Sequence, residues 1–250
     1  IKRNIKKVSL NISIRSKEGI LIKKSVQTIN QVKAFSISLK KILKFKSGTK
    51  FKSGSIELEI LSDKNMVYPY PALVVNYQGK DSSAVVHTCG RIYNNRKDFL
   101  ENNQQKVLET GIDILPNKDF IPFFSFVNGK SKIKKTELNI KVINYLGEEF
   151  TKIIILKDLK PYETKFVYFL NDNEKKFLRE KKATVKIKHN FTNFFPRFLS
   201  GNIQQNFYNS SLTHTYYDTS KQKDKNAFWP NPNKNIFYDS SVSFPLFKNK

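Results

Sequence analysis

Two stretches of this chain, about 127 residues apart, are nearly alike, and this repetition constrains the fold more than any other feature of the sequence. They read Ser82-Ser83-Ala84-Val85-Val86-His87-Thr88 and Ser210-Ser211-Leu212-Thr213-His214-Thr215. Further short matches occur in the same order, beginning with Asn11-Ile12-Ser13-Ile14 and Gly19 against Asn139-Ile140-Lys141-Val142 and Gly147. Ordered matches of this kind are typical of an internal repeat. We therefore predict two copies of one module, residues 1–128 and residues 129–250.

Length and composition agree with two compact modules. The chain has 250 residues, enough for two domains of roughly 100 to 150 residues each. Its hydrophobic content of 39% is typical of folded proteins rather than disordered ones. The single cysteine, Cys89, excludes a disulfide within the chain, so packing must hold both modules together. No apolar run approaches the roughly 20 residues that a membrane-spanning helix needs, and we expect no transmembrane segment.

The periodicity of both copies is that of β-strands. Residues 8–14 alternate apolar and polar side chains, a turn follows at 16–19, and residues 20–22 resume the extended pattern. The second copy repeats this hairpin at 138–143 and 150–156. Further strands are predicted at 55–61, 72–77, 83–88, 91–93, 166–169, 183–189, 197–199 and 211–217. Turn signals recur every 8 to 12 residues or so, as in sandwiches and barrels, which predicts an all-β fold.

One segment also resembles a known architecture. Between residues 137 and 169, an asparagine-glycine turn joins two strands, and Leu159-Lys160-Pro161-Tyr162-Glu163 then leads into a third. This pattern resembles bacterial immunoglobulin-like sandwiches, and the resemblance implies a fold rather than a function. We expect two tandem immunoglobulin-like, or related, β-sandwich modules, each with at most one short helix. These helices are predicted at 39–43 and 173–178, the second capped by Asp172 or Asn173.

The formal net charge of +24 suggests a nucleic-acid partner, but the charge comes mainly from lysine rather than arginine, which argues against that partner. Only six of the basic residues are arginines, although phosphate and base recognition favours the bidentate guanidinium. Many lysines alternate with apolar residues, as in Val185-Lys186-Ile187-Lys188, which would place them on the solvent face of strands. They accompany abundant Asn, Ile and Phe, the set that AT-rich codons specify. Binding of a polyanion such as nucleic acid stays an alternative.

Motifs of the common enzyme classes are missing from the sequence. It contains no glycine-rich phosphate loop, no Cys-x-x-Cys pair, no His-x-x-x-His and no Gly-x-Ser-x-Gly elbow. A metal site pairing His214 with Asp218 would lack a counterpart in the first copy, where Arg91 follows His87. Because metal sites usually need three or four ligands, we expect no metal and no cofactor. A hydrolase or metal-dependent enzyme centred on His214 and Asp218 is kept as a second alternative.

Residues that differ between the copies are the better candidates for ligand binding, because a duplicated fold keeps in both copies what folding requires. The candidates are His214, Tyr216, Tyr217, Asp218 and Trp229, the last in an irregular segment at 219–235. The positions repeated between the copies, predicted to serve the fold, are His87, Thr88 and Thr215. Tyrosine and tryptophan offer flat amphipathic surfaces for a sugar ring or a partner loop. We expect a non-enzymatic binding protein for a glycan or another protein, at the cell envelope or secreted.

Overall fold

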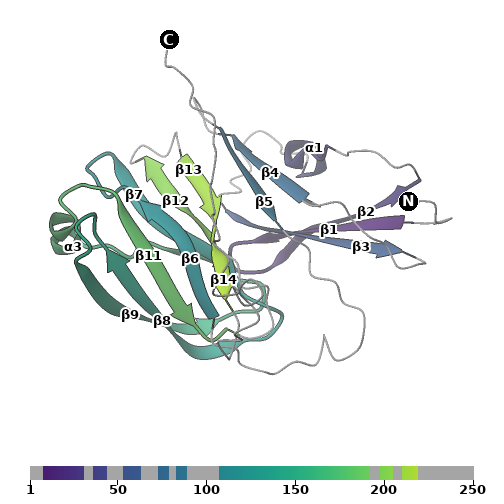
Figure 1. The fold of residues 1–250 in the computed structure, drawn as a ribbon. Coiled ribbons are helices and arrows are strands. Elements are labelled where there is room, and N and C mark those ends of the chain that lie inside the picture. Colours follow the sequence, from purple (N-terminus) through teal and green to yellow (C-terminus); the bar gives the residue numbers. More distant parts are fainter. Residues whose placement is uncertain are drawn as a thin grey trace, which may run out of the picture. The chain divides into compact units, whose positions relative to one another are not determined.

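The computed structural model describes residues 8–30, 36–43, 53–62, 73–78, 83–88, 107–191, 198–204 and 210–218. Most of these residues lie in β-strands that form four sheets (Figure 1), which confirms the all-β prediction. All of them belong to one compact unit, residues 1–218. The predicted module boundary between residues 128 and 129 stays a prediction. The strand predicted at 91–93 and the segment at 219–235 lie outside the described residues.

Two of the sheets pack face to face around the larger hydrophobic core. The five-stranded sheet has the spatial order β14 (Tyr216–Asp218), β6 (Val107–Ile114), β11 (Ala183–His189), β8 (Ile133–Ile143) and β9 (Glu149–Leu159). The four-stranded sheet has the order β10 (Thr164–Val167), β7 (Phe120–Val127), β12 (Leu199–Gln204) and β13 (Ser210–His214). Phe124 and Phe126 of β7 meet Ile140 of β8 and Val185 of β11 in this core. Burying one such side chain stabilises the fold by roughly 1.5–3 kcal/mol.

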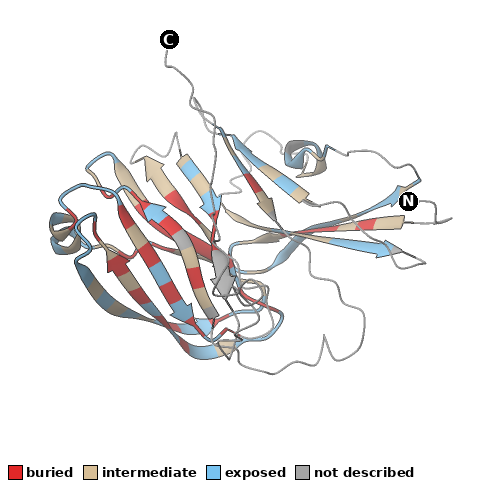
Figure 2. Cartoon of the chain, viewed as in Figure 1, coloured by how far each residue is buried: buried red, intermediate tan, exposed pale blue. Residues whose placement is uncertain are grey.

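Strands β8 and β11 of the five-stranded sheet follow the period of two expected of a sheet with one buried face. Val185 and Ile187 of β11 are fully buried, whereas the residues that follow each of them, Lys186 and Lys188, are exposed. Figure 2 shows this alternation of buried and exposed residues along β11 and β8. Successive side chains of a strand point to opposite faces, so the lysines of β11 lie on the solvent face as predicted.

The N-terminal residues form two smaller sheets. One has the order β2 (Leu21–Ile29), β1 (Val8–Ser16) and β3 (Gly54–Ser62), and the other pairs β4 (Leu73–Gln78) with β5 (Ser83–Thr88). Ile12 and Ile14 of β1 are almost completely buried and form the centre of a second, smaller core. The short helix α1 (Leu39–Leu43) packs Ile42 against this core.

The β1–β2 and β8–β9 hairpins close through turns of the same geometry, 128 positions apart. Gly19 and Gly147 both have a left-handed backbone, with φ of 85° and 83°, which glycine adopts at little cost. In the first turn, the N–H of Ser16 donates to the carbonyl oxygen of Ile20 (2.8 Å) and that of Gly19 to the carbonyl oxygen of Ser16 (3.0 Å). In the second turn, the N–H of Asn144 donates to the carbonyl oxygen of Glu148 (2.9 Å) and that of Gly147 to the carbonyl oxygen of Asn144 (3.1 Å).

Strand pairing is also the same in the two parts of the chain. The orders β2-β1-β3 and β9-β8-β11 correspond strand by strand, as do the pairs β4-β5 and β12-β13. Ile12 lies opposite Leu58 between β1 and β3, and Ile140 lies opposite Ile187 between β8 and β11. Hence the residues that match in sequence hold matching positions in their sheets.

Several predicted elements differ from the structure. The predicted strand 211–217 breaks at Thr215, so that β13 joins the four-stranded sheet and β14 the five-stranded sheet. The strand predicted at 197–199 begins instead at Leu199 and continues to Gln204. The cap of α3 (Asp172–Phe177) was placed wrongly at Asp172 or Asn173. It is Asn171, whose extended backbone leaves its side chain free to accept a hydrogen bond from the N–H of Glu174.

No helix in the described part of the chain combines the length and the apolar character needed to cross a membrane.

Candidate functional site

The two histidines of the repeated sequence element face each other. His87 lies near the end of β5 and His214 at the end of β13, and these two strands lie beside each other. The Nε2 atoms of the two rings are 3.1 Å apart, and the ring planes are nearly perpendicular, at 82°. His214 is buried, whereas His87 is partly exposed. The ends of β5 and β13, which match in sequence, thus place their histidine side chains against each other.

Hydrogen bonding fixes the tautomer of His214. Its Nδ1 lies 2.9 Å from the carbonyl oxygen of Thr215. A carbonyl oxygen only accepts, so Nδ1 carries a proton and donates it. In the neutral imidazole the Nε2 lone pair is therefore left pointing to the His87 ring.

A buried carboxylate lies on the other side of Thr215. The hydroxyl of Thr215 donates to Glu109 Oε2 and accepts from the N–H of Phe198 at 2.8 Å. Glu109 Oε1 lies 3.2 Å from Nε2 of His189, and the side chains of Glu109 and His189 are both fully buried. The N–H of Phe191 donates to Nδ1 of His189 at 3.3 Å, so His189 is the neutral tautomer with its proton on Nε2.

All three histidines of the chain therefore belong to one connected network, which runs from His87 through His214, Thr215 and Glu109 to His189. The ring of Phe198 stacks on His189 with the centroids 5.0 Å apart, and the ring of Phe191 lies tilted against it at 4.7 Å. Buried polar groups need partners, and here Glu109 supplies one to both His189 and Thr215. The inner part of the network holds β6, β11 and the β13–β14 junction together, and His87 is a partly exposed member of it.

The sequence-predicted ligand-binding residues are only partly brought together. His214 and Thr215 are in the network, and Thr88 is the last residue of β5, opposite Leu73. Tyr216, Tyr217 and Asp218 form β14, which pairs with β6, but their side chains lie outside the described part. Trp229 also lies outside it. Within the described residues, no group of three or more His, Cys, Asp and Glu side chains is arranged to hold a metal ion.

Sequence reasoning missed Glu109 and His189. His189 has no equivalent histidine in the first copy, so the repeat does not point to it, and Glu109 lies in β6, a strand that the sequence pattern does not predict. The available signal was chemical: a third histidine at the end of the apolar strand 183–189, in a chain with few histidines. A buried imidazole requires a polar partner, so a histidine in an apolar strand itself indicates a polar group buried beside it.

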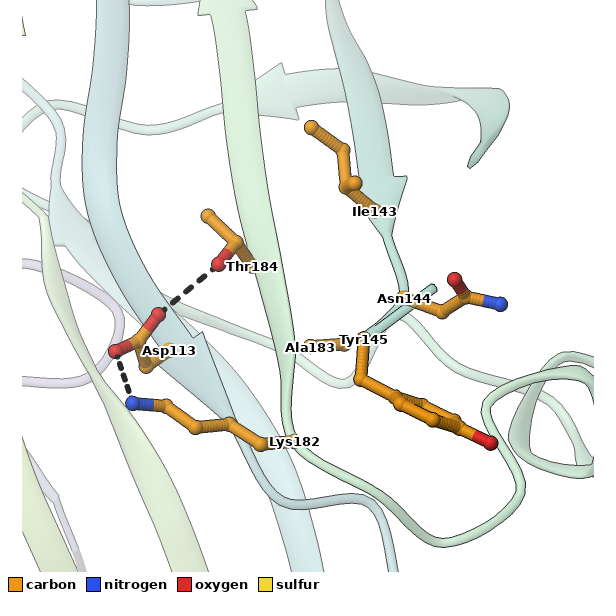
Figure 3. Close-up of a pocket in the computed structure, with 7 residues that line it drawn as sticks. All are labelled: Asp113, Ile143, Asn144, Tyr145, Lys182, Ala183 and Thr184. Carbon is orange, nitrogen blue, oxygen red and sulfur yellow. Dashed lines mark hydrogen bonds and ion pairs between the residues drawn. The ribbon is translucent and has the colours of Figure 1, made fainter. Parts of the chain in front are cut away.

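A shallow pocket of about 340 Å³ lies at one end of the outer face of the five-stranded sheet (Figure 3). It is lined by Asp113, Ile143, Asn144, Tyr145, Lys182, Ala183 and Thr184. Asp113 accepts a hydrogen bond of 3.1 Å from the hydroxyl of Thr184 and lies 2.8 Å from Nζ of Lys182. The hydrogen bond from Lys182 to Asp113 and the attraction of that carboxylate raise the pKa of Lys182, which keeps its positive charge at neutral pH. The half-exposed Tyr145 gives the pocket a flat wall.

Comparison of the chain with protein-family models, with curated proteins and with solved structures found no match.

Proposed function

We propose that this chain is a non-enzymatic interaction protein, built from two duplicated immunoglobulin-like β-sandwich modules, that binds another protein at the cell envelope or outside the cell. Duplication is supported by the shared geometry of the Gly19 and Gly147 turns and by the shared register of β1–β3 and β8–β11. A non-enzymatic role is supported by the buried network, in which Glu109, His189 and Thr215 bind one another rather than facing solvent.

The observation that carries the proposal is a pair of equivalent strand edges. Strands β2 and β9 hold the same outer place in their sheets, and no strand of the described residues pairs with their outer edges. Both expose branched apolar side chains: Leu21 and Val26 of β2 are 51% and 60% exposed, and Ile153 and Ile155 of β9 are 57% and 49% exposed. An open strand edge with apolar side chains is the surface to which an extended peptide adds as a further strand.

Selection from a library of extended peptides tests this proposal on the whole chain. We expect peptides with alternating apolar residues to bind, and Ile153→Lys to weaken that binding roughly tenfold, because it removes about 1.5 kcal/mol of apolar burial. The matched control is Tyr168→Lys, which adds the same charge at a residue of similar exposure (52%) beyond the end of β10. Equal weakening by both variants would count against the strand edge.

A glycan bound through Tyr145, found in a parallel glycan array, would instead favour the pocket and a carbohydrate ligand.

Polyanion binding is the second candidate, because the outer face of the five-stranded sheet places lysines directly opposite one another. Lys141 lies opposite Lys186, and Lys135 lies opposite Lys157. Like charges in such cross-strand pairs destabilise a sheet. Lys188, also exposed, extends this basic face. Glu149 lies 2.5 Å from Lys141 and Glu137 lies 3.8 Å from Lys135, so these carboxylates balance part of the repulsion, and a bound anion would relieve the rest.

The salt dependence of binding to random-sequence double-stranded DNA tests the second candidate. If the basic face contacts phosphates, the double variant Lys186→Gln/Lys188→Gln is expected to reduce the slope of log K against log salt by about two. The control, Lys118→Gln/Lys160→Gln, removes the same charge from exposed turns away from this face. A slope that falls equally in both variants would show that the charge acts diffusely and would contradict a dedicated surface.

A further inference from the structure

We propose that His87 and His214 form a binding site for a divalent transition-metal ion, with zinc, nickel and copper as the chemical class, which links β5 to β13. Imidazole nitrogens are preferred ligands of these ions. Neither this site nor any metal is part of the function proposed above, and the inference stands on the geometry of the two rings alone.

The distance between the two nitrogens fits a shared ion. Two histidine nitrogens, each about 2.0–2.1 Å from one zinc ion with tetrahedral geometry, are about 3.3 Å apart. The two Nε2 atoms here are 3.1 Å apart, on rings whose planes cross at 82°. The ring centroids are only 4.4 Å apart, so a small separation of β5 and β13 must be accompanied by a rotation of the rings that turns both Nε2 lone pairs to the ion.

His214 is already oriented as a ligand. Metal-binding histidines usually donate their second N–H to a carbonyl or carboxylate, which fixes the ring and its tautomer. The Nδ1 of His214 makes such a bond to the carbonyl oxygen of Thr215, at 2.9 Å. For His87 to bind the same ion through Nε2, its proton must reside on Nδ1. The His87 ring is partly exposed, so an ion can reach the site from solvent.

Both ligands come from strands that match in sequence and in pairing. His87 lies opposite Val74 of β4, and His214 lies opposite Leu199 of β12. Each copy of the repeated element contributes one histidine, and because the two strand ends lie together, the two histidines can bind the same ion. The two imidazoles supply two coordination positions, and water completes the shell of the ion. Such a site would bind its ion less tightly than a site with four protein ligands, and its occupancy would follow the metal concentration.

Titration of the full chain with Zn²⁺ tests the inference, because its three histidines can be followed separately. Long-range ¹H–¹⁵N NMR spectra report the nitrogens of each imidazole. We expect one equivalent of Zn²⁺ to shift the signals of His87 and His214 and to leave those of the buried His189 unchanged. His189 is thus an internal control. Calorimetric titration should show saturable binding that is lost in His87→Ala and in His214→Ala.

The outcomes that overturn the inference are equally specific. Absence of any zinc-dependent shift would mean that the two rings form only a hydrogen bond with each other. Saturable binding that survives both substitutions would place the ion elsewhere in the chain. If His214→Ala fails to fold because its ring is buried, His87→Ala decides the matter, since that side chain is partly exposed. Copper(II) in the same chain should give an electron paramagnetic resonance spectrum with couplings to two imidazole nitrogens, reduced to one in His87→Ala.

Discussion

Replacing Glu109 with alanine is expected to lower the free energy of unfolding by about 3–5 kcal/mol, a large share of the about 5–15 kcal/mol that holds an ordinary domain. Glu109 is fully buried and accepts hydrogen bonds from both His189 and Thr215. Removing the carboxylate leaves two buried donors without this partner, each at a cost of about 1–3 kcal/mol. Urea unfolding followed by circular dichroism measures the effect as a shift of the midpoint.

Two further variants separate the network from charge and from packing. Glu109→Gln keeps an acceptor oxygen and nearly the same volume, so it is expected to lose clearly less stability than the alanine variant. Glu137→Ala removes the same carboxylate from the exposed face of β8 in the same sheet, and such surface changes usually stay within about 0.5 kcal/mol. If the loss of unfolding free energy in Glu109→Ala also stayed within this range, the buried network would not contribute to the stability of the fold as proposed.

The elements that sequence reasoning predicted well are those set by local chemistry. Strand β11 was predicted at its correct bounds, because Val185, Lys186, Ile187 and Lys188 alternate without interruption. The two hairpins were predicted because a glycine marks each turn. In both cases the side-chain period or the backbone freedom of a single residue determines the local structure, and distant contacts are not needed to recognise it.

What sequence reasoning missed depends on contacts distant in the chain. Strand β6 was not predicted because its alternation is broken in two ways. Glu109 places a carboxylate on the buried face, which makes sense only once His189 and Thr215 are beside it, and the register of β6 against β11 shifts between Val185 and Ile187. The same holds for the break between β13 and β14, where Thr215 turns inward to reach Glu109. The repeat identified His87 and His214 as equivalent but gave no means of knowing that they meet.

The N-terminal hairpin turn also makes distant contacts, with the turn between β9 and β10. The N–H of Thr164 donates to the carbonyl oxygen of Lys17 at 2.8 Å, and the guanidinium of Arg15 lies 4.0 Å from the centre of the Tyr162 ring. At Gly19 an added Cβ would overlap the carbonyl oxygen of Pro161 and lie 2.9 Å from the carbonyl carbon of Tyr162. At Gly147, which holds the same place in the second hairpin, an added Cβ would have no neighbour within 4 Å.

The two glycines therefore make a matched pair of variants that isolates this contact. Gly147→Ala is expected to cost about 1–2 kcal/mol, the price of a left-handed backbone for an L-residue. Gly19→Ala meets the same backbone strain, because the two φ angles differ by only two degrees (85° and 83°), and in addition forces the hairpin away from the Pro161 backbone. We expect a further loss of about 1–3 kcal/mol, as for overpacking at a close contact. Urea midpoints of the two variants measure the difference, and equal losses would mean that the N-terminal hairpin does not rest on this turn in solution.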